Sequence, residues 1–211
     1  PNIYPSPFWG KDPNKGTWTC ATAKARLEKQ IAEWKAEGIN FAAHLLQYFI
    51  DKRGPAPYTP TADDIAETKV HAWKMIKHSL SAFFSRRTTQ PSDGWFGYNR
   101  MTHVQWGAWF YPLGPSDKNM FAAYGGADLT INGEFLRAGS AATGKNVTIK
   151  FDDFYTFAPT GFLGLRTAFP SYDAARYLEL NCCTEPFKHS LTYTDTITFN
   201  FYDRPSLIPI D

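Results

Sequence analysis

The sequence changes character near Thr88, and this change constrains the fold more than any other feature. Before it, apolar residues recur at the three- and four-residue spacing of amphipathic helices. After it, short aromatic and apolar runs alternate with polar residues and are separated by Gly, Pro and Asn, as in antiparallel strands. Helices followed by strands are typical of the α+β class. We therefore expect an N-terminal arm and helical segment (1–88) packed on an antiparallel, twisted sheet or half-barrel (89–211), as one continuous domain.

Three helices are predicted in the first half, over about 19–37, 41–52 and 61–85. Gly38 is a natural end for the first, and Asn40 is a candidate cap for the second. Thr61 and Asp64 have the spacing of a capping box at the start of the third. The third helix carries one apolar stripe that we expect to be buried: Ala66, Val70, Trp73, Ile76, Leu80 and Phe84.

The second half contains several candidate strands, at 104–111, 120–124, 128–131, 134–137, 147–157 and 191–202. Asn132-Gly133 predicts a two-residue hairpin turn between two of them. Residues 139–146 are predicted to be a polar turn. The segment from Ser171 to Leu180 fits either a short helix capped by Ser171 or a strand.

Composition disfavours some classes of function. The formal charge is +2, with 22 basic and 20 acidic residues interleaved, which disfavours a nucleic-acid partner. No apolar run is long enough to span a bilayer, and no basic-then-apolar leader is present. The three cysteines include one adjacent pair, which predicts free thiols in a protein that folds in a reducing compartment.

The strand predicted at 147–157 ends in two adjacent carboxylates and a tyrosine. Asp153 and Tyr155 share one face of such a strand, and Asp152 lies on the other. A carboxylate beside a phenol can act as a general acid or base, and Asp152 and Asp153 can bind a hard cation such as Mg²⁺ or Ca²⁺. A solvated strand end with no chemical role explains the same residues.

Two further residues complete the candidate site. His103 lies at a loop-to-strand junction, where a histidine can transfer protons near neutral pH. Arg166 follows a Gly-rich turn and can grip a phosphate or form a structural bridge to Asp153. A histidine that only caps a strand is the alternative for His103.

Four short motifs occur together in the second half: His103-Val-Gln-Trp, Phe151-Asp-Asp-Phe-Tyr-Thr-Phe, Arg176-Tyr-Leu-Glu-Leu and Glu185-Pro-Phe. Their order resembles uncharacterised C-terminal domains of bacterial polymorphic toxins and type VI secretion cargo. The Asp153-x-Tyr155 element also resembles the colicin M family, which cleaves the lipid-linked peptidoglycan precursor. That family has a second acid directly after the tyrosine and a His-Arg pair shortly beyond. Here Thr156 replaces the acid and Arg166 is the only nearby basic residue.

The resemblance implies an antibacterial effector that is secreted or delivered into a target cell, acts in the periplasm and has a cognate immunity protein. Its substrate would be an envelope glycan or a lipid-linked precursor, and if it is an enzyme it would be a hydrolase. Asp153 would then be the acid, base or metal ligand, His103 a second proton-transfer group and Arg166 a phosphate clamp. The alternative is a non-enzymatic carbohydrate-binding or secretion-adaptor module that stacks sugars on exposed rings: Trp95, Trp106 and Trp109.

Overall fold

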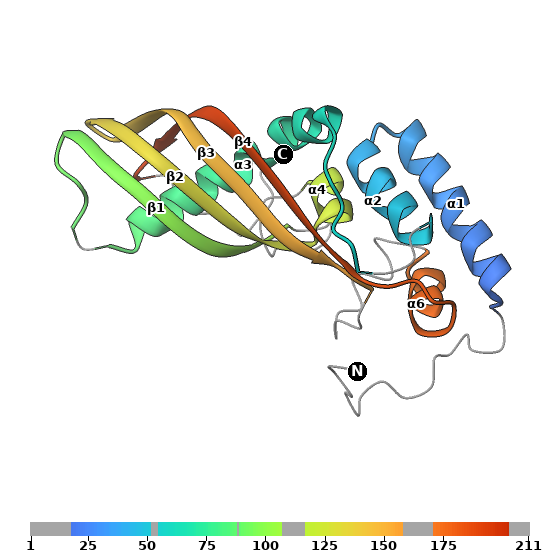
Figure 1. Cartoon of the computed structure of the whole chain (residues 1–211). Helices are drawn as coiled ribbons and strands as arrows, with labels where there is room; N and C mark the ends of the chain where they lie inside the picture. The colour runs from blue at the N-terminus through green and yellow to red at the C-terminus, as the bar shows by residue number, and fades with distance from the viewer. Residues whose placement is uncertain (1–17, 52–54, 88, 107–116, 158–170, 203–211) are drawn as a thin grey trace.

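The computed structural model describes residues 18–51, 55–87, 89–106, 117–157 and 171–202. A long sheet forms one side of the molecule, and most of the helices gather at one of its ends (Figure 1). Within the described residues there are five helices and four antiparallel strands, so the predicted α+β class is confirmed. The sheet is open, because its first and last strands do not pair with each other.

Helix α1 (Cys20–Ala36) begins at a capping box formed by Thr19 and Thr22. In this box each side chain accepts a hydrogen bond from the other residue's backbone N–H. The helix ends just before Gly38, whose φ of +77° lies in the left-handed region that glycine adopts without steric cost. The predicted first helix and its end are confirmed.

Helix α2 (Asn40–Asp51) starts where the sequence predicts, but a different residue satisfies its first N–H groups. The Glu67 carboxylate accepts hydrogen bonds from the backbone N–H groups of Asn40, at 3.1 Å, and Phe41, at 3.0 Å. A carboxylate at a helix N-terminus satisfies donors that have no intrahelical partner and interacts favourably with the helix dipole. The cap comes from another helix, so local sequence could not indicate it.

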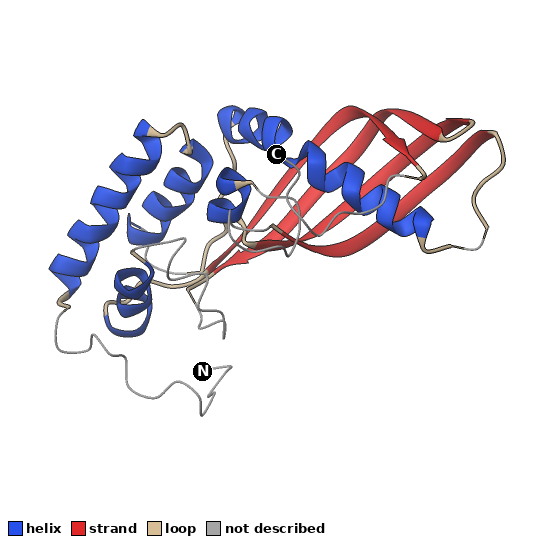
Figure 2. Cartoon of the chain, turned by 180° about the vertical axis from the view of Figure 1, so that it is seen from behind, coloured by secondary structure: helices blue, strands red, loops and turns tan. Residues whose placement is uncertain are grey.

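Helix α3 (Ala62–Ser85) begins at the predicted capping box of Thr61 and Asp64. It lies along one face of the sheet (Figure 2). The predicted apolar stripe is wrong at three positions: Ala66 is exposed, Val70 is 64% exposed and Trp73 is 45% exposed. The buried face instead follows a neighbouring set of positions: Asp64, Thr68, Ala72, Met75, Ile76, Ser79, Leu80, Ser81 and Phe84.

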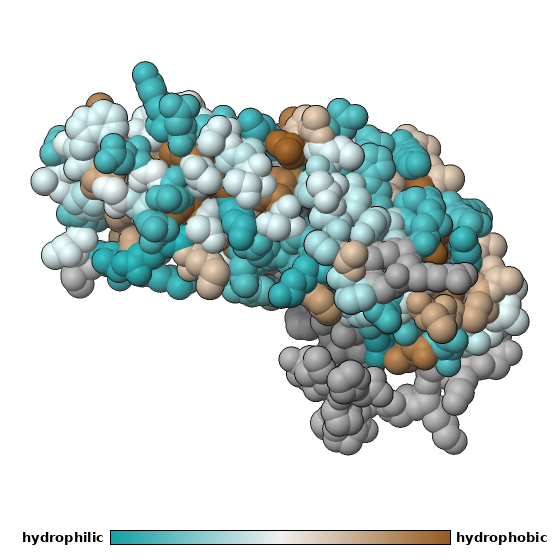
Figure 3. Space-filling model, in the orientation of Figure 1, coloured by the Kyte–Doolittle hydropathy of each residue, from teal (hydrophilic) through white to brown (hydrophobic). Residues whose placement is uncertain are grey.

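The four strands pair in chain order, each antiparallel to the next. They are β1 (Gly94–Gln105), β2 (Gly126–Ala138), β3 (Ala141–Tyr155) and β4 (Phe187–Asn200). Helix α3 covers one face, which carries the buried apolar residues, and the other face is open. The open face is mostly hydrophilic where Figure 3 shows it. In β4 buried and exposed residues alternate, which confirms the apolar face and the threonine face predicted there.

Aromatic rings fill the space between α3 and the sheet. The Phe84 ring of α3 lies 4.9 Å from the Phe201 ring and is stacked 5.6 Å from the Phe199 ring. The rings of Phe96 in β1 and Phe135 in β2 are stacked, with 5.7 Å between their centroids. Edge-to-face and offset rings at these spacings add stabilisation to that of the buried area. The high aromatic content therefore serves mainly the core.

Two predicted strands differ from the structure. The strand predicted at 104–111 overlaps only the end of β1, since β1 ends at Gln105, and 107–111 lie outside the described residues. The segment predicted as a strand at 120–124 is largely helix α4 (Lys118–Ala123). Asp117 caps this helix by accepting a hydrogen bond from the Met120 N–H at 3.0 Å. The short apolar run alone does not distinguish a helix from a strand. The capping residue, which does, lies before that run.

The hairpin predicted at Asn132-Gly133 is also wrong, because this pair lies inside β2 at a register shift. The pairing of β3 with β4 has a register shift as well, between Gly144 and Val147 of β3. A Cβ at Gly144 would lie 2.6 Å from Val147 Cγ2, so glycine is required at this bulge. The chain turns instead at Gly139 and Ser140, and most of the predicted turn at 139–146 belongs to β3.

The segment after Ser171 is helix α6 (Tyr172–Asn181), which decides between the two alternatives for that region. Helices α4 and α6 lie with α1 and α2 at the same end of the sheet (Figure 1). The helical end of the molecule is therefore assembled from both halves of the chain. The boundary at residue 88 stays a prediction.

Candidate functional site

Asp153 of β3 lies directly opposite His189 of β4 in the sheet register. Asp153 Oδ2 is 3.3 Å from His189 Nε2. The imidazole side chain is 0% exposed and the carboxylate side chain 17% exposed. An ionised carboxylate can only accept, so Nε2 carries the proton of this hydrogen bond. A fully buried imidazole thus fixes the orientation of a carboxylate that solvent can still reach.

The His189 ring is itself held in place by packing. It stacks on Tyr124, with 5.0 Å between ring centroids, and meets the edge of Phe41 at 6.0 Å. Among the described residues, His189 Nδ1 is a buried atom without a hydrogen-bond partner. With Nε2 protonated, Nδ1 of a neutral ring is an acceptor that faces the protein interior.

Tyr155 lies two residues beyond Asp153, and its ring also contacts the His189 ring, at 6.3 Å. Burial, and then the neighbouring charge of Asp153, raise the pKa of the Tyr155 phenol far above its ordinary value. The phenol is therefore neutral and almost fully buried. Of the two residues on this strand face, solvent therefore reaches the Asp153 carboxylate and hardly reaches the Tyr155 phenol.

The open face of the sheet carries a second polar group at the same end. The registers align His103 with Asp128, Asp128 with Asp152, and Asp152 with Ser190, one residue from each strand. His103 Nδ1 is 3.0 Å from Asp128 Oδ1, and these side chains are 70% and 48% exposed. Lys150 Nζ is 2.7 Å from Asp152 Oδ2. His103 therefore pairs with Asp128 and not with Asp153.

Both groups line one open pocket of about 750 Å³. Its basic side chains are His103, Lys150, Lys188 and His189, and its carboxylates are Asp128, Asp152 and Asp153. Such a mixture suits a polar substrate that carries hydroxyl and anionic groups. The remaining lining residues are Pro57, Tyr58, Thr59, Pro60, Ala127, Phe154 and Ser190.

The predicted cation site is not brought together by the fold. Asp152 and Asp153 are successive strand residues that point to opposite faces, where one pairs with Lys150 and the other with His189. In the part of the chain that the structure describes, no group of three or more His, Cys, Asp or Glu side chains is arranged to hold a metal ion.

Three further residues were predicted to bind a phosphate or a sugar: Arg166, Trp109 and Trp106. Arg166 and Trp109 lie outside the described residues. Trp106 is buried against Tyr124, with stacked rings 5.4 Å apart, so the sugar-stacking role predicted for it is wrong. Trp95 is 67% exposed.

One wall of the pocket is tied to helix α3 through Tyr58. Its backbone N–H donates to the Lys188 carbonyl at 3.0 Å, beside β4, and its hydroxyl donates to Asp64 at 2.7 Å. Asp64 has no exposed side-chain surface and also lies 2.7 Å from His44 Nδ1. Burial, followed by the hydrogen bond to Asp64, raises the Tyr58 pKa. The capping carboxylate of α3 therefore also anchors the pocket wall.

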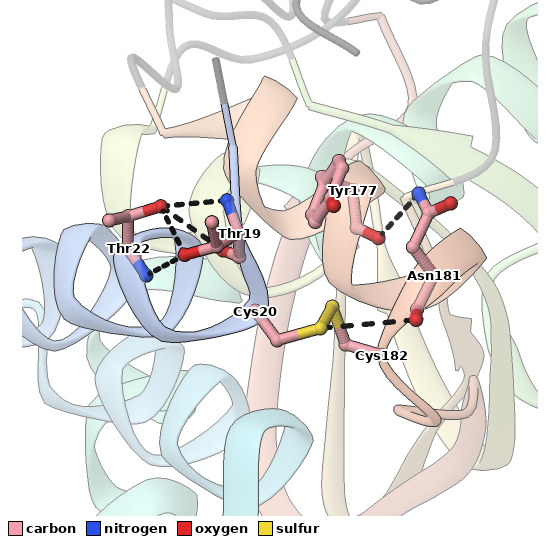
Figure 4. The surroundings of a disulfide bond; sticks show 6 residues. All are labelled: Thr19, Cys20, Thr22, Tyr177, Asn181 and Cys182. Atoms are coloured by element: carbon pink, nitrogen blue, oxygen red, sulfur yellow. Dashed lines mark hydrogen bonds between the residues drawn. A yellow bond between two sulfur atoms is a disulfide. The ribbon is translucent and has the colours of Figure 1, made fainter. Parts of the chain in front are cut away.

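Cys20 of α1 and Cys182, just after α6, form a disulfide across 162 residues of chain (Figure 4). The prediction of free thiols in a reducing compartment is therefore wrong for these two, and only Cys183 is free and exposed. The sequence did not indicate that α1 and α6 lie side by side. Disulfides are typical of oxidising compartments. No helix among the described ranges has the length and apolarity to cross a membrane.

Sequence reasoning missed His189, Asp128, Lys150 and Lys188 as members of the site. His189 lies outside the predicted strand at 191–202, although the apolar alternation of that strand continues back through it to Phe187. Extending the strand would have put His189 on the buried face. Its pairing with Asp153 depends on the β3–β4 register, which no short turn fixes.

The fold and site define an α+β protein with an open four-stranded meander and a carboxylate–imidazole pair at one end of it. No protein-family model matches the chain, and no curated protein matches it in sequence. Two solved structures to which it is similar are those of bacteriocins. One is PaeM, a colicin M-like bacteriocin produced by Pseudomonas aeruginosa, with 14% identity and a TM-score of 0.41 over 77% of this chain and 51% of that chain.

A second neighbour is the truncated bacteriocin syringacin M from Pseudomonas syringae pv. tomato DC3000. It shares 11% identity, with a TM-score of 0.39, over 78% of this chain and 62% of that chain. The chain thus spans between half and two thirds of the length of these bacteriocins. At TM-scores below 0.5 the likeness carries no argument about function.

Proposed function

We propose that this chain is an antibacterial toxin domain that acts on a cell-envelope substrate and hydrolyses a peptidoglycan precursor in the pocket beside Asp153. The observation that carries the proposal is the Asp153 carboxylate, fixed by the buried His189 and still reached by solvent. Preorganised carboxylates of this kind serve as general bases, because their geometry is set before substrate binds.

In this proposal Asp153 accepts a proton from the attacking water, and His103 donates a proton to the leaving group. His103 Nδ1 is engaged by Asp128, which leaves Nε2 for the pocket. A carboxylate that holds one ring nitrogen and frees the other is the arrangement used in hydrolytic triads. Lys188 and Lys150 would stabilise anionic groups of the substrate, and Arg166 is proposed as a phosphate clamp.

The disulfide supports action outside a reducing cytosol. Cys20 and Cys182 close a loop of 162 residues, and such bonds persist in secreted and periplasmic proteins. Secretion or delivery into a target cell, activity in the periplasm and neutralisation by a cognate immunity protein are parts of the same proposal.

Expression in the cytoplasm and in the periplasm of a bacterium, scored by growth, tests the proposal. We expect killing only from the periplasm, and we expect Asp153→Asn and His103→Gln to abolish it while circular dichroism stays unchanged. Asp195→Asn, at a solvent-accessible position of β4, is the matched control and should kill like the wild type. If both site variants killed as well as the wild type, Asp153 and His103 could not be the catalytic base and acid.

A carbohydrate-binding module is the second candidate, favoured by Trp95. Its exposed side chain lies directly opposite Leu136, another exposed apolar residue, on the open face of the sheet. An exposed ring on a polar face can stack on a sugar. Glycan binding that is lost in Trp95→Ala, without any toxicity in the periplasm, would support this candidate over the toxin.

A further inference from the structure

Helix α3 has a pronounced charge asymmetry along its length. From Thr68 to Gln90 the sequence contains no Asp or Glu, although the whole chain has 20 acidic residues. The same stretch contains five basic residues: Lys69, Lys74, Lys77, Arg86 and Arg87. A segment of one sign in a chain of nearly balanced charge indicates a surface that meets an anionic partner.

The two large apolar residues of α3 that are exposed, Val70 and Trp73, lie on this basic surface. Val70, Trp73, Lys74 and Lys77 are spaced by three, four and seven residues, so they share one face of the helix. The Lys74 and Lys77 Nζ atoms lie 5.7 and 4.9 Å from the centre of the Trp73 ring. We call these four residues the α3 stripe.

Among the residues that the structure describes, Val70 and Trp73 of the α3 stripe are not buried against a neighbouring element. The helix contacts the sheet through its opposite, buried face, while Val70 and Trp73 remain exposed. Leaving a valine and a tryptophan in water forgoes the free energy of burying them. An exposed Trp flanked by lysines is typical of helices that lie in a membrane interface.

We propose that the α3 stripe binds the surface of an anionic phospholipid bilayer. Trp73 and Val70 would enter the headgroup region, and Lys74 and Lys77 would contact lipid phosphates. Further positive charge lies near the C-terminal end of the helix, where Arg87 and Arg100 lie 4.2 and 5.0 Å from the Phe83 ring.

Acidic residues border the stripe without interrupting it. Asp63, Asp64 and Glu67 are in the first turns of α3, and Asp195 follows Thr194, whose carbonyl accepts a hydrogen bond from Lys69. A nucleic acid or an acidic protein could use the cations alone. The adjacent Val70 and Trp73 favour the bilayer, since contacts to phosphate need no apolar pair.

Binding through the α3 stripe would keep the pocket accessible. Helix α3 lies on one face of the sheet (Figure 2), and His103 and Ser190 are exposed residues whose strand neighbours Val104 and Leu191 are buried. The inference is independent of the proposed hydrolysis, because no residue of the stripe lines the pocket.

Co-sedimentation of the full chain with vesicles tests the proposal. We expect binding to phosphatidylcholine vesicles that contain phosphatidylglycerol, little binding to phosphatidylcholine alone, and release at high salt. Replacing both lysines by glutamine should weaken binding by roughly 30-fold, at the usual contribution of a basic residue near an anionic surface. Trp73→Ala should weaken it by about tenfold, through the loss of interfacial apolar area.

Matched variants show whether the position or the residue type matters. Trp95→Ala removes an exposed Trp from the open face, and Lys29→Gln with Lys35→Gln removes two lysines of α1. These variants and Asp153→Asn should bind vesicles like the wild type. Equal binding to both lipid compositions, no binding to either, an equal loss in the α1 variant, or tighter binding to duplex DNA than to vesicles would overturn the proposal.

Discussion

Two carboxylate–imidazole pairs lie at the same end of the sheet but on its opposite faces. Asp153 and His189 join β3 to β4 on the face that α3 covers, where the imidazole is completely buried. Asp128 and His103 join β1 to β2 on the open face, where both side chains remain largely in water. The two pairs have the same chemistry and similar geometry. Solvent reaches the carboxylate of both pairs, but burial makes the His189 imidazole part of the core, whereas the exposed His103 imidazole is free to exchange a proton with a substrate.

Removing each imidazole gives the largest contrast between the pairs. His189→Ala leaves a cavity among Tyr124 and Phe41 and removes the partner of Asp153, so we expect a loss of roughly 3–4 kcal/mol in the free energy of unfolding. His103→Ala removes an exposed side chain and should change it by less than about 0.5 kcal/mol. Urea unfolding of both variants measures the difference. Similar losses would show that the burial of His189 does not matter.

Removing each carboxylate tests the functional side of the comparison. Asp153→Asn should lower toxin activity by roughly 10²–10⁴-fold, the usual loss on removing a general base. Asp128→Asn keeps a hydrogen-bonding group next to His103 and should cost only about tenfold. Titration of the purified variants against growing cells, or against an isolated precursor, measures both. An inactive Asp128→Asn beside an active Asp153→Asn would reverse the assigned roles.

The sequence predicted one member of each pair and missed its partner. Asp153, Tyr155 and His103 were found because strand alternation and a loop-to-strand junction are local features. His189 and Asp128 were not found, because their partners are set by the β3–β4 and β1–β2 registers. Sequence patterns do not fix a register where no short turn joins the strands.

The same distinction runs through the fold. The capping boxes of α1 and α3 follow from neighbouring residues, and the predicted α3 box was correct. The Glu67 cap of α2, the disulfide between α1 and α6 and the exposure of Trp73 depend on contacts distant in sequence. Asn132-Gly133 was wrong for a related reason: the same pair suits a turn and a bulge, and packing against Val147 decides which forms.

Tyr155, which lies beside the buried pair, makes the stability of the protein depend on pH above about pH 10. Burial and the charge of Asp153 raise its folded pKa above the ordinary value of 10.0, which applies when the chain is unfolded. The unfolded chain therefore loses a proton that the folded chain keeps, so stability is complete below about pH 10 and falls as the pH rises further. Tyr155→Phe should reduce this slope by about 0.7 kcal/mol per pH unit on average between pH 9 and 11, and by about 1.4 kcal/mol per pH unit at higher pH. Denaturant unfolding between pH 9 and 11 measures it, and an unchanged slope would show that the phenol titrates normally.

A small effect on stability is also expected on the open face, at the Lys150–Asp152 ion pair. Its atoms are 2.7 Å apart, but both side chains are substantially exposed. Exposed pairs contribute little because water screens them and ordering the side chains costs entropy. Lys150→Ala should change the free energy of unfolding by less than about 1 kcal/mol. If the pocket instead binds an anionic substrate, the same variant should weaken substrate binding several-fold, so a normal stability with impaired binding would assign Lys150 to the substrate and not to the fold.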